Sequence, residues 1–343
     1  MSIQKKIFFG LLSLFIFPIF AMGSGIKDLE ILQKAVQESA AKAAPYVVQL
    51  KILATPTRPR YNPFSPIPYG RGSGNLSTVG ERYVSALIAS EDGLLLTDAS
   101  HLVGKINSIL AIIGSKEYPV KIVAKDYRFN LALLKIGKKE KDLKLKPISF
   151  EKPVSLRVGT FVATVGKAYD SQSPTVSFGI ISAVHRYGDY AIQTDAAVSP
   201  GCTGGALVDL KGNILGMVVT LTKRVGVNSG IGFAIPLSVL KKSLEIMKKE
   251  GTIKPAFFGI RFTTHPKGGI KIEEVVKGSA AEKSGIQVGD QVIEMNGTKI
   301  KDMDDFRKKV MLKRAGEEIH LLVLRNGKTL KIKAVLGVRP GIR

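Results

Sequence analysis

Hydrophobic residues recur at two different spacings along this chain, and each spacing predicts a different kind of element. Between residues 28 and 42, apolar side chains recur every three or four positions, as they do on one face of an amphipathic helix. From Tyr46 onward, the chain forms short apolar runs rich in β-branched residues and separated by Gly, Asp and Asn. Such runs are typical of strands joined by turns. A second helical pattern occupies 237–249 and ends before Gly251, a residue type favoured directly after helices.

The predicted strands fall into two sets. The first set lies between 46 and 136 and the second between 160 and 236, with the polar and basic stretch 137–146 between them. Many short strands at regular spacing favour closed antiparallel barrels. The segment 55–74 is rich in Pro, Gly and Arg and is predicted to be an irregular loop. We therefore expect a mainly all-β fold.

A third region begins near Pro255, after the second predicted helix. Its apolar runs are separated by turn signals such as Asn326-Gly327, and Asn-Gly between apolar runs is a strong hairpin signal. A further helix is predicted from Met303 to Lys313. We therefore expect a separate domain at 251–343, after a larger domain at 24–250.

The first 23 residues have the three parts of a secretory signal peptide. Lys5-Lys6 form a positive start, 7–20 form an apolar run, and Ala21-Met22-Gly23 is a small-x-small cleavage site. The apolar run is shorter than the roughly 20 residues that span a bilayer. We expect export to the periplasm or beyond, with an uncleaved membrane anchor as the alternative.

Composition narrows the classes of function. The 343 residues carry a formal net charge of +23, but the basic residues are interleaved with acids and no nucleic-acid-binding motif accompanies them. We expect no nucleic-acid partner. Cys202 is the only cysteine, so the chain has no intrachain disulfide, and without a Cys/His cluster we expect no zinc. No Gly-rich phosphate-binding motif precedes a helix, and we expect no cofactor.

The segment 195–207, read as Asp-Ala-Ala-Val-Ser-Pro-Gly-Cys-Thr-Gly-Gly-Ala-Leu, carries the clearest chemical signal. It closely resembles the nucleophile loop Asp-Ala-x-x-x-Pro-Gly-Asn-Ser-Gly-Gly of the HtrA/Deg (DegP-like) family of trypsin-like serine proteases. Further matches lie at 179–182 and 230–236, and 251–343 resembles a PDZ domain of the permuted bacterial form. The resemblance implies a trypsin-like double six-stranded β-barrel followed by a PDZ domain of mixed α and β structure.

All three triad positions depart from the family pattern. Thr203 stands where the family has its nucleophilic serine, and Asn130 stands where it has the aspartate of Asp-x-x-x-Asp-Leu-Ala. The histidine of Thr-Asn-x-His falls on Ser100 when the segments are matched without a gap, or on His101 with a one-residue insertion. An acyl-transfer protease needs a hydroxyl nucleophile, a histidine base and an orienting carboxylate. We therefore expect an inactive pseudoprotease.

Two other functions remain open at this point. In the first, Thr203 is the nucleophile and His101 the base of a slow endopeptidase. In the second, the chain is a regulatory subunit of an active family member. Gly201 and the backbone at Thr203 are expected to form an oxyanion-hole-like pair of N–H donors. Cys202 is expected to be a small buried hydrophobe rather than a nucleophile. The larger residues at Tyr83 and Ser85–Ala86, where the family has Gly-Ser-Gly, indicate a repacked wall near the cleft.

The PDZ resemblance implies peptide binding. Its carboxylate-binding loop matches 257–260, where backbone N–H groups would capture a C-terminal carboxylate while the peptide adds as a strand. The side chains of the helix that begins near Met303 would line the pocket for the last residue. The expected peptide-binding residues are Phe257, Phe258, Gly259, Ile260, Phe306 and Val310. The expected partners are C-terminal or unfolded peptide segments, other copies of this chain in a trimer, and an active homologue in a hetero-oligomer.

Overall fold

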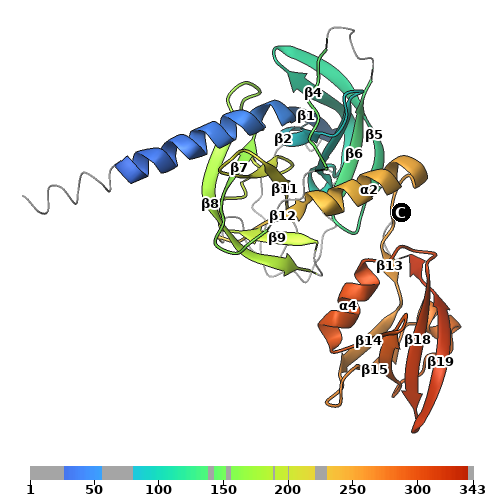
Figure 1. Ribbon diagram of the computed structural model, residues 1–343. Coiled ribbons are helices and arrows are strands. Elements are labelled where there is room, and N and C mark those ends of the chain that lie inside the picture. The colour runs from blue at the N-terminus through green and yellow to red at the C-terminus, as the bar shows by residue number, and fades with distance from the viewer. Residues whose placement is uncertain are drawn as a thin grey trace, which may run out of the picture.

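The computed structural model describes residues 27–55, 80–137, 143–151, 156–187, 190–199, 201–220 and 230–338. Its first element is a helix at 27–43, which extends away from the rest of the molecule (Figure 1) and agrees with the helix predicted at 28–42. A 3-10 turn, η1 (Ala44–Tyr46), leads from this helix into the first strand. The predicted signal peptide and most of the loop predicted at 55–74 lie outside the described residues.

Two closed six-stranded antiparallel barrels follow, side by side in Figure 1, and they confirm the predicted fold class. The first barrel has the order β1-β2-β3-β6-β5-β4 and the second the order β7-β8-β9-β12-β11-β10. The strands of the first barrel are β1 (Val47–Thr55), β2 (Gly80–Ile88), β3 (Leu94–Asp98), β4 (Lys105–Ile113), β5 (Lys116–Asp126) and β6 (Leu131–Ile136). Those of the second are β7 (Phe161–Gly166), β8 (Thr175–Arg186), β9 (Ala191–Thr194), β10 (Ala206–Asp209), β11 (Ile214–Val219) and β12 (Gly232–Pro236).

Each barrel has its own apolar interior, and a shared layer joins the two. Leu50 and Leu134 are fully buried inside the first barrel, and Ile192 lies in the interior of the second. A larger cluster contains Leu96 from the first barrel and Val165 from the second, so one continuous core crosses the boundary. Burial of apolar area, at about 25 cal/mol per Å², is the main force that holds the barrels together.

The helix α2 (Leu237–Glu250) leads from the second barrel toward the last domain (Figure 1). Its buried face includes Leu240, Leu244 and Met247, which pack into the shared layer. The helix ends at Gly251, whose φ of 79° is available to glycine without steric cost, as the sequence predicted. Among the described residues, no helix is both long enough and apolar enough to cross a membrane.

The last domain is a five-stranded path β14-β15-β16-β18-β19 with β17 beside β16, and two short helices. The turn at Asn326 and Gly327 has positive φ at both residues, which confirms the predicted Asn-Gly hairpin between β18 and β19. The elements are β13 (Ala256–Phe257), β14 (Ile260–Thr264), β15 (Ile270–Val275), α3 (Ala280–Lys283), β16 (Gln291–Met295), β17 (Thr298–Lys299), α4 (Met303–Met311), β18 (Glu318–Arg325), β19 (Lys328–Val335) and β20 (Gly337–Val338).

Helix α4 is shorter than the sequence indicated. It ends at Met311 instead of at Lys313. The Leu312 carbonyl accepts a hydrogen bond from Arg128 of the first barrel, so a contact between domains is made where the helical pattern predicted another turn.

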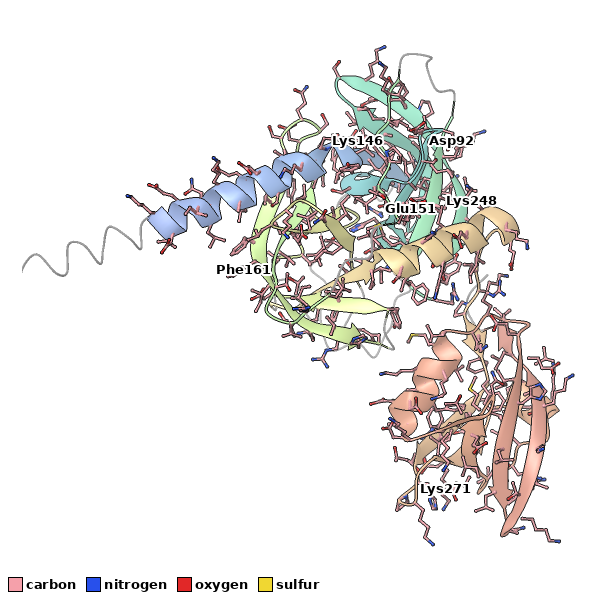
Figure 2. The ribbon with its side chains drawn as sticks, viewed as in Figure 1. Asp92, Lys146, Glu151, Phe161, Lys248 and Lys271 are labelled. Atoms are coloured by element: carbon pink, nitrogen blue, oxygen red, sulfur yellow. The ribbon has the colours of Figure 1, made fainter. Side chains whose placement is uncertain are left out.

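Positive charge is spread over the whole molecule. Figure 2 shows Lys146 on the barrel side, Lys248 on α2 and Lys271 at the far end of the last domain. This distribution matches the interleaving of basic and acidic residues along the sequence.

Candidate functional site

Thr203 lies in the loop between β9 and β10, and both of its donors are occupied. Its hydroxyl donates to the Ser199 carbonyl at 3.0 Å, and its backbone N–H donates to the same carbonyl at 3.2 Å. The residue is only 2% exposed. The Thr203 N–H is therefore turned into its own loop, and the predicted pair of N–H donors at Gly201 and Thr203 stays a prediction.

Ser85 of β2 joins this loop to the first barrel. Its N–H donates to the Thr203 carbonyl at 3.2 Å and its hydroxyl donates to the Gly201 carbonyl at 3.0 Å, while the Lys167 N–H donates to that hydroxyl at 2.8 Å. Gly204 has a φ of 84°, and a Cβ there would overlap the Ser85 carbonyl oxygen. The sequence marked this strand only as a repacked wall, and its role as the anchor of the loop depends on contacts between distant segments.

Asp98 ends β3 and forms the polar centre of the other half of the site. Its side chain caps the 3-10 turn η2 (Ala99–His101) by accepting the Ser100 N–H at 2.8 Å. The same oxygen accepts the side-chain amide of Asn130 at 2.5 Å, and the second oxygen accepts the Thr220 N–H at 2.6 Å. Asp98 is fully buried. Two of the predicted site residues, Ser100 and Asn130, are thus brought together by a carboxylate that the sequence did not single out.

The backbone at Asn130 supports this arrangement. Asn130 has a φ of 58°, a left-handed conformation that asparagine tolerates better than most residues. In this conformation its carbonyl accepts the Ala99 N–H at 2.7 Å while its side chain contacts Asp98. Asn130 therefore holds the start of the turn that carries Ser100, through both its backbone and its side chain.

His101 is placed apart from Thr203. Its carbonyl accepts a hydrogen bond from Arg82 at 3.1 Å, and its Nε2 is buried without a hydrogen-bond partner in the part of the chain that the structure describes. The Thr203 hydroxyl donates to Ser199. No hydrogen bond therefore joins this histidine Nε2 to the threonine here.

Burial controls the electrostatics of the Asp98 and His101 pair. Burial raises the pKa of Asp98 above its ordinary value, while the Thr220 and Ser100 N–H groups act in the opposite direction. Burial also lowers the pKa of His101, against the attraction of Asp98. A neutral imidazole is the form that this position favours.

Two recesses flank these residues. A cavity of about 740 Å³ lies between the first barrel, the second barrel and α4, and it is lined by Ser100, Asn130, Tyr187, Tyr190 and Met311 among others. His101 is absent from its lining. A smaller recess of about 230 Å³ is lined by 195–198 and 230–232, directly before and across from the Thr203 loop. Ser100 and Asn130 therefore lie beside space that a peptide side chain can occupy, whereas Thr203 lines neither recess.

Cys202 is buried, as the sequence predicted. It is 1% exposed, and its nearest polar neighbour is the Thr175 carbonyl, 3.9 Å from the sulfur. These contacts are those of a small core residue and give no support to a thiol nucleophile. Within the described ranges, no group of three or more His, Cys, Asp or Glu side chains has a geometry that could hold a metal ion.

The predicted carboxylate loop of the last domain turns at Gly259. Its φ is 87°, and a Cβ there would overlap the Ser279 side chain, so glycine is required. The Gly259 carbonyl accepts the Val276 N–H at 2.9 Å and the Ser279 hydroxyl at 3.3 Å, which fixes the loop. The next element, β14, pairs only with β15 and is an edge of the sheet. An edge strand beside a helix is the geometry in which a peptide adds as a further strand.

The two predicted pocket residues on α4 have different surroundings. Phe306 is 2% exposed and packs edge-on against Phe262 at a centroid distance of 5.2 Å, within the domain core. Val310 is half-buried on the same core cluster. Phe306 is therefore set beneath the groove, and Val310 is the more accessible of the two.

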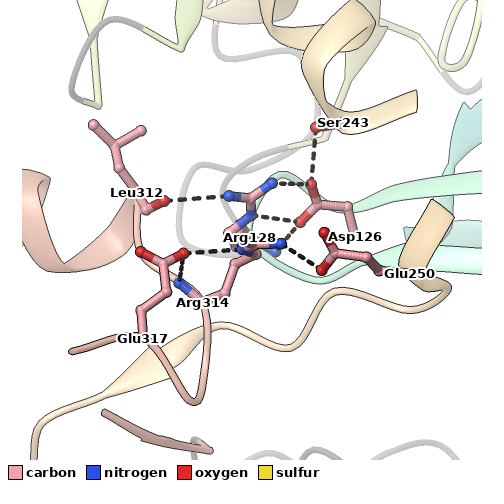
Figure 3. Close-up of polar contacts among 7 residues, drawn as sticks. All are labelled: Asp126, Arg128, Ser243, Glu250, Leu312, Arg314 and Glu317. Atoms are coloured by element: carbon pink, nitrogen blue, oxygen red, sulfur yellow. Dashed lines mark hydrogen bonds and ion pairs between the residues drawn. The ribbon is translucent and has the colours of Figure 1, made fainter. Parts of the chain in front are cut away.

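The last domain contacts the first barrel through Arg128, whose side chain is held by a buried ion pair within that barrel (Figure 3). Arg128 forms a two-point contact with Asp126 at 2.8 and 3.0 Å and donates to the Leu312 carbonyl at 3.2 Å. Ser243 of α2 donates to the same carboxylate at 2.8 Å. The side chain of Asp126 is inaccessible to solvent and that of Arg128 is only 7% exposed.

A second set of charges surrounds this contact. Arg314 forms ion pairs with Glu250 at 2.5 Å and with Glu317 at 2.9 Å (Figure 3). Nearby, the Tyr190 hydroxyl donates to the Met311 sulfur at 2.7 Å, and burial raises the pKa of Tyr190. Arg128, Tyr190 and Glu250 therefore contact three residues at or just after the end of α4, namely Leu312, Met311 and Arg314.

Comparison with protein families assigns both halves of the chain. Residues 84–217 match the trypsin-like peptidase domain, and residues 246–324 match the PDZ domain.

Relatives with this combination are periplasmic proteases. The chain is 33% identical over 269 residues to the probable periplasmic serine protease do/HhoA-like of Haemophilus influenzae, covering 73% of this chain and 57% of that protein. It is 30% identical over 299 residues to the periplasmic serine endoprotease DegP of Salmonella typhimurium, covering 80% of this chain and 62% of that protein. The chain thus spans little more than half the length of these curated relatives.

Solved structures agree with the fold over nearly the whole chain. The HtrA-type protease AlgW with tripeptide superimposes with a TM-score of 0.70 at 27% identity, covering 90% of this chain and 98% of that one. The serine endoprotease from Yersinia pestis gives a TM-score of 0.66 at 27% identity, with 89% and 98% covered.

Proposed function

The chain belongs to the HtrA/Deg family of trypsin-like serine proteases with a PDZ domain, and we propose that this member binds peptides without cutting them. The observation that carries this proposal is the engagement of the Thr203 hydroxyl and N–H by one carbonyl, that of Ser199. A nucleophile must have its hydroxyl next to a base, and an oxyanion must find free N–H donors. Neither condition holds at Thr203 in this conformation.

The neighbouring substitutions support the same function. Asn130 cannot stabilise an imidazolium, and asparagine at the triad aspartate lowers turnover about 10⁴-fold in the well-studied serine proteases. Ser100 cannot act as a general base at neutral pH, and His101 has no hydrogen bond through Nε2. Thr203 adds a β-methyl group that restricts χ1 in a tight loop. With the catalytic residue types replaced at all three positions, the fold would serve as a scaffold for binding instead of cleavage.

The PDZ domain is the proposed site of peptide capture. The loop 257–260 would hold a C-terminal carboxylate, and the edge strand β14 would pair with the peptide backbone. Val310 would contact the last side chain, with Phe306 supporting the pocket from below. The structural neighbour AlgW, which was solved with short peptides, supports this choice of ligand class.

Assembly and location follow as further parts of the proposal. We place the protein in the periplasm after removal of 1–23, with the protease-like domain at 24–250 and the PDZ domain at 251–343. It would act in protein quality control as a homotrimer, binding C-terminal or unfolded segments in the manner of a chaperone. The periplasmic relatives and the signal-like N-terminus support this location.

Proteolysis is tested with unfolded casein and a fluorophosphonate probe. We expect the purified protein to leave casein intact and Thr203 unlabelled, with an active family protease as the positive control. Cleavage by the wild type that is lost in both Thr203→Ala and His101→Ala would instead establish the slow endopeptidase.

Peptide binding is tested by fluorescence anisotropy with two versions of one labelled peptide. We expect the peptide with a free C-terminus to bind and its C-terminal amide to bind at least tenfold more weakly. Val310→Glu is expected to weaken binding, whereas the control Val335→Glu, at an exposed position on β19, keeps it. Equal binding of the two peptides would contradict carboxylate capture.

The regulatory-subunit alternative makes a different prediction. A protein that tunes an active homologue must be found in one complex with it. Affinity purification from the native host followed by mass spectrometry distinguishes the two cases. A strictly homomeric assembly supports the peptide-binding protein that acts alone.

A further inference from the structure

Asp98 is a buried carboxylate that the proposed peptide-binding function does not use. It occupies the last position of β3, and β3 pairs antiparallel with β6 so that Asp98 lies opposite Leu131. Asn130 precedes Leu131, and the pairing therefore places the side chains of 98 and 130 together at the end of these two strands. No local sequence pattern predicts that these two side chains meet; the pairing of the strands brings them together.

Asp98 is the acceptor in each of its hydrogen bonds given above. Its two oxygens accept from the Ser100 N–H, the Asn130 amide and the Thr220 N–H. Every partner is a donor. An asparagine at 98 would turn an N–H₂ group toward at least one of these donors, so this position needs a group that only accepts.

The family pattern given above has these two residue types in the opposite order. It carries Asn in Thr-Asn-x-His, where this chain has Asp98, and Asp in Asp-Leu-Ala, where this chain has Asn130. The carboxylate and the carboxamide have therefore exchanged places across one strand pair, and they remain hydrogen-bonded at 2.5 Å.

We propose that Asp98 is the positioning carboxylate of this site and holds residue 100 in the orientation that the triad aspartate gives its histidine. The acid of the site has moved from one strand end to the next instead of being lost. In this chain the residue so held is Ser100, whose N–H donates to Asp98 at 2.8 Å. This inference goes beyond peptide binding, because it stands whether or not the protein cuts peptides.

The first experiment is a thermodynamic cycle on the exchanged pair. Asp98→Asn removes the carboxylate, so that two side-chain amides, at 98 and 130, face each other. Asn130→Asp places two carboxylates next to each other. We expect each single variant to lower the melting temperature and the double variant Asp98→Asn/Asn130→Asp to recover most of the loss. A double variant that loses the sum of the two single effects overturns the exchange.

The second experiment measures orientation, which stability alone does not report. In Ser100→His, we expect the new imidazole to bond to the Asp98 carboxylate and its NMR-titrated pKa to exceed that in Ser100→His/Asp98→Asn by about one unit, a tenfold change in proton affinity. Arg82 and His101 act on this cluster, and the charged or titratable groups that line the cavity beside Ser100 are Lys125, Tyr127, Arg128, Tyr187 and Tyr190; all are present in each variant. The control Ser100→His/Asp92→Asn changes an exposed carboxylate and should keep the higher pKa.

A third variant provides a folded comparison if Asp98→Asn alone folds poorly. Ser100→His/Asp98→Asn/Asn130→Asp restores the order of the family pattern and is expected to show the same raised pKa as Ser100→His. The proposal fails if the imidazole has the same pKa in Ser100→His and in Ser100→His/Asp98→Asn, or, where the latter variant does not fold, if the pKa in Ser100→His does not exceed the ordinary value of about 6.5. The casein and probe assays are unaffected by this result, so the two proposals are tested separately.

Discussion

The backbone N–H of Ser85 donates to the Thr203 carbonyl across 3.2 Å and thereby joins the first barrel to the loop of the second. The Ser85 hydroxyl extends the contact to Gly201 and Lys167. The loop that identifies the family is thus held from the opposite barrel, and its closed conformation is a property of the whole molecule. Two variants, Ser85→Ala and Gly204→Ala, test the contacts that set this arrangement.

Replacing Ser85 with alanine removes the hydroxyl but keeps the backbone bond. The Lys167 N–H and the Gly201 carbonyl then lose a buried partner, and we expect a loss of about 1–3 kcal/mol in the free energy of unfolding. Chemical denaturation measures it. The control Ser171→Ala removes an exposed hydroxyl and should stay within about 0.5 kcal/mol of the wild type.

Gly204→Ala tests the close approach of the two barrels. The left-handed conformation alone costs alanine about 1–2 kcal/mol, and at Gly204 the new Cβ also overlaps the Ser85 carbonyl. We expect a loss well above that value. Gly114→Ala has the same sign of φ but open space around its Cβ, so it measures the conformational term by itself. Similar losses in the two variants would show that the contact with Ser85 is unimportant.

Arg128→Ala tests the junction with the PDZ domain. Asp126 would remain buried without its cation, a change that typically costs about 3–5 kcal/mol, and the Leu312 contact would be lost. Arg261→Ala is the matched control, because it breaks an exposed ion pair with Glu274 that contributes about 0–1 kcal/mol. Differential scanning calorimetry measures both. A small effect at Arg128 would indicate that the domains are held by other contacts.

The pH dependence of stability reports on His101. Burial lowers its pKa below 6.5, so the folded protein binds this proton less tightly than the unfolded chain does. The contribution of His101 to stability is therefore complete above pH 6.5 and is lost as the pH falls below 6.5 toward the folded pKa. We expect His101→Leu to lose less stability than the wild type between pH 7.5 and 5.5 in urea denaturation. The exposed His320→Leu is the control for removing a histidine that is not buried.

Much of the fold could be predicted because local patterns and motifs decide it. The apolar runs between Tyr46 and Pro236 form the strands of two barrels, and the Asn326-Gly327 turn forms the hairpin that its residue types favour. Burial of Cys202 was predictable for the same reason, since a free cysteine is among the most often buried residue types. The contact of Arg128 with the Leu312 carbonyl was not, because Arg128 lies far away in sequence.

The amino-acid sequence by itself determined the family, the order of the domains and the identities at the three replaced positions, because these depend on residue types and their spacing. Only the tertiary structure placed Ser100 at the lining of the cavity, closed Thr203 on Ser199 and located Asp98 among its donors. Each of these depends on donors and acceptors from distant strands. A buried carboxylate is located by the groups that hydrogen-bond to it, and those groups meet only after the barrels close.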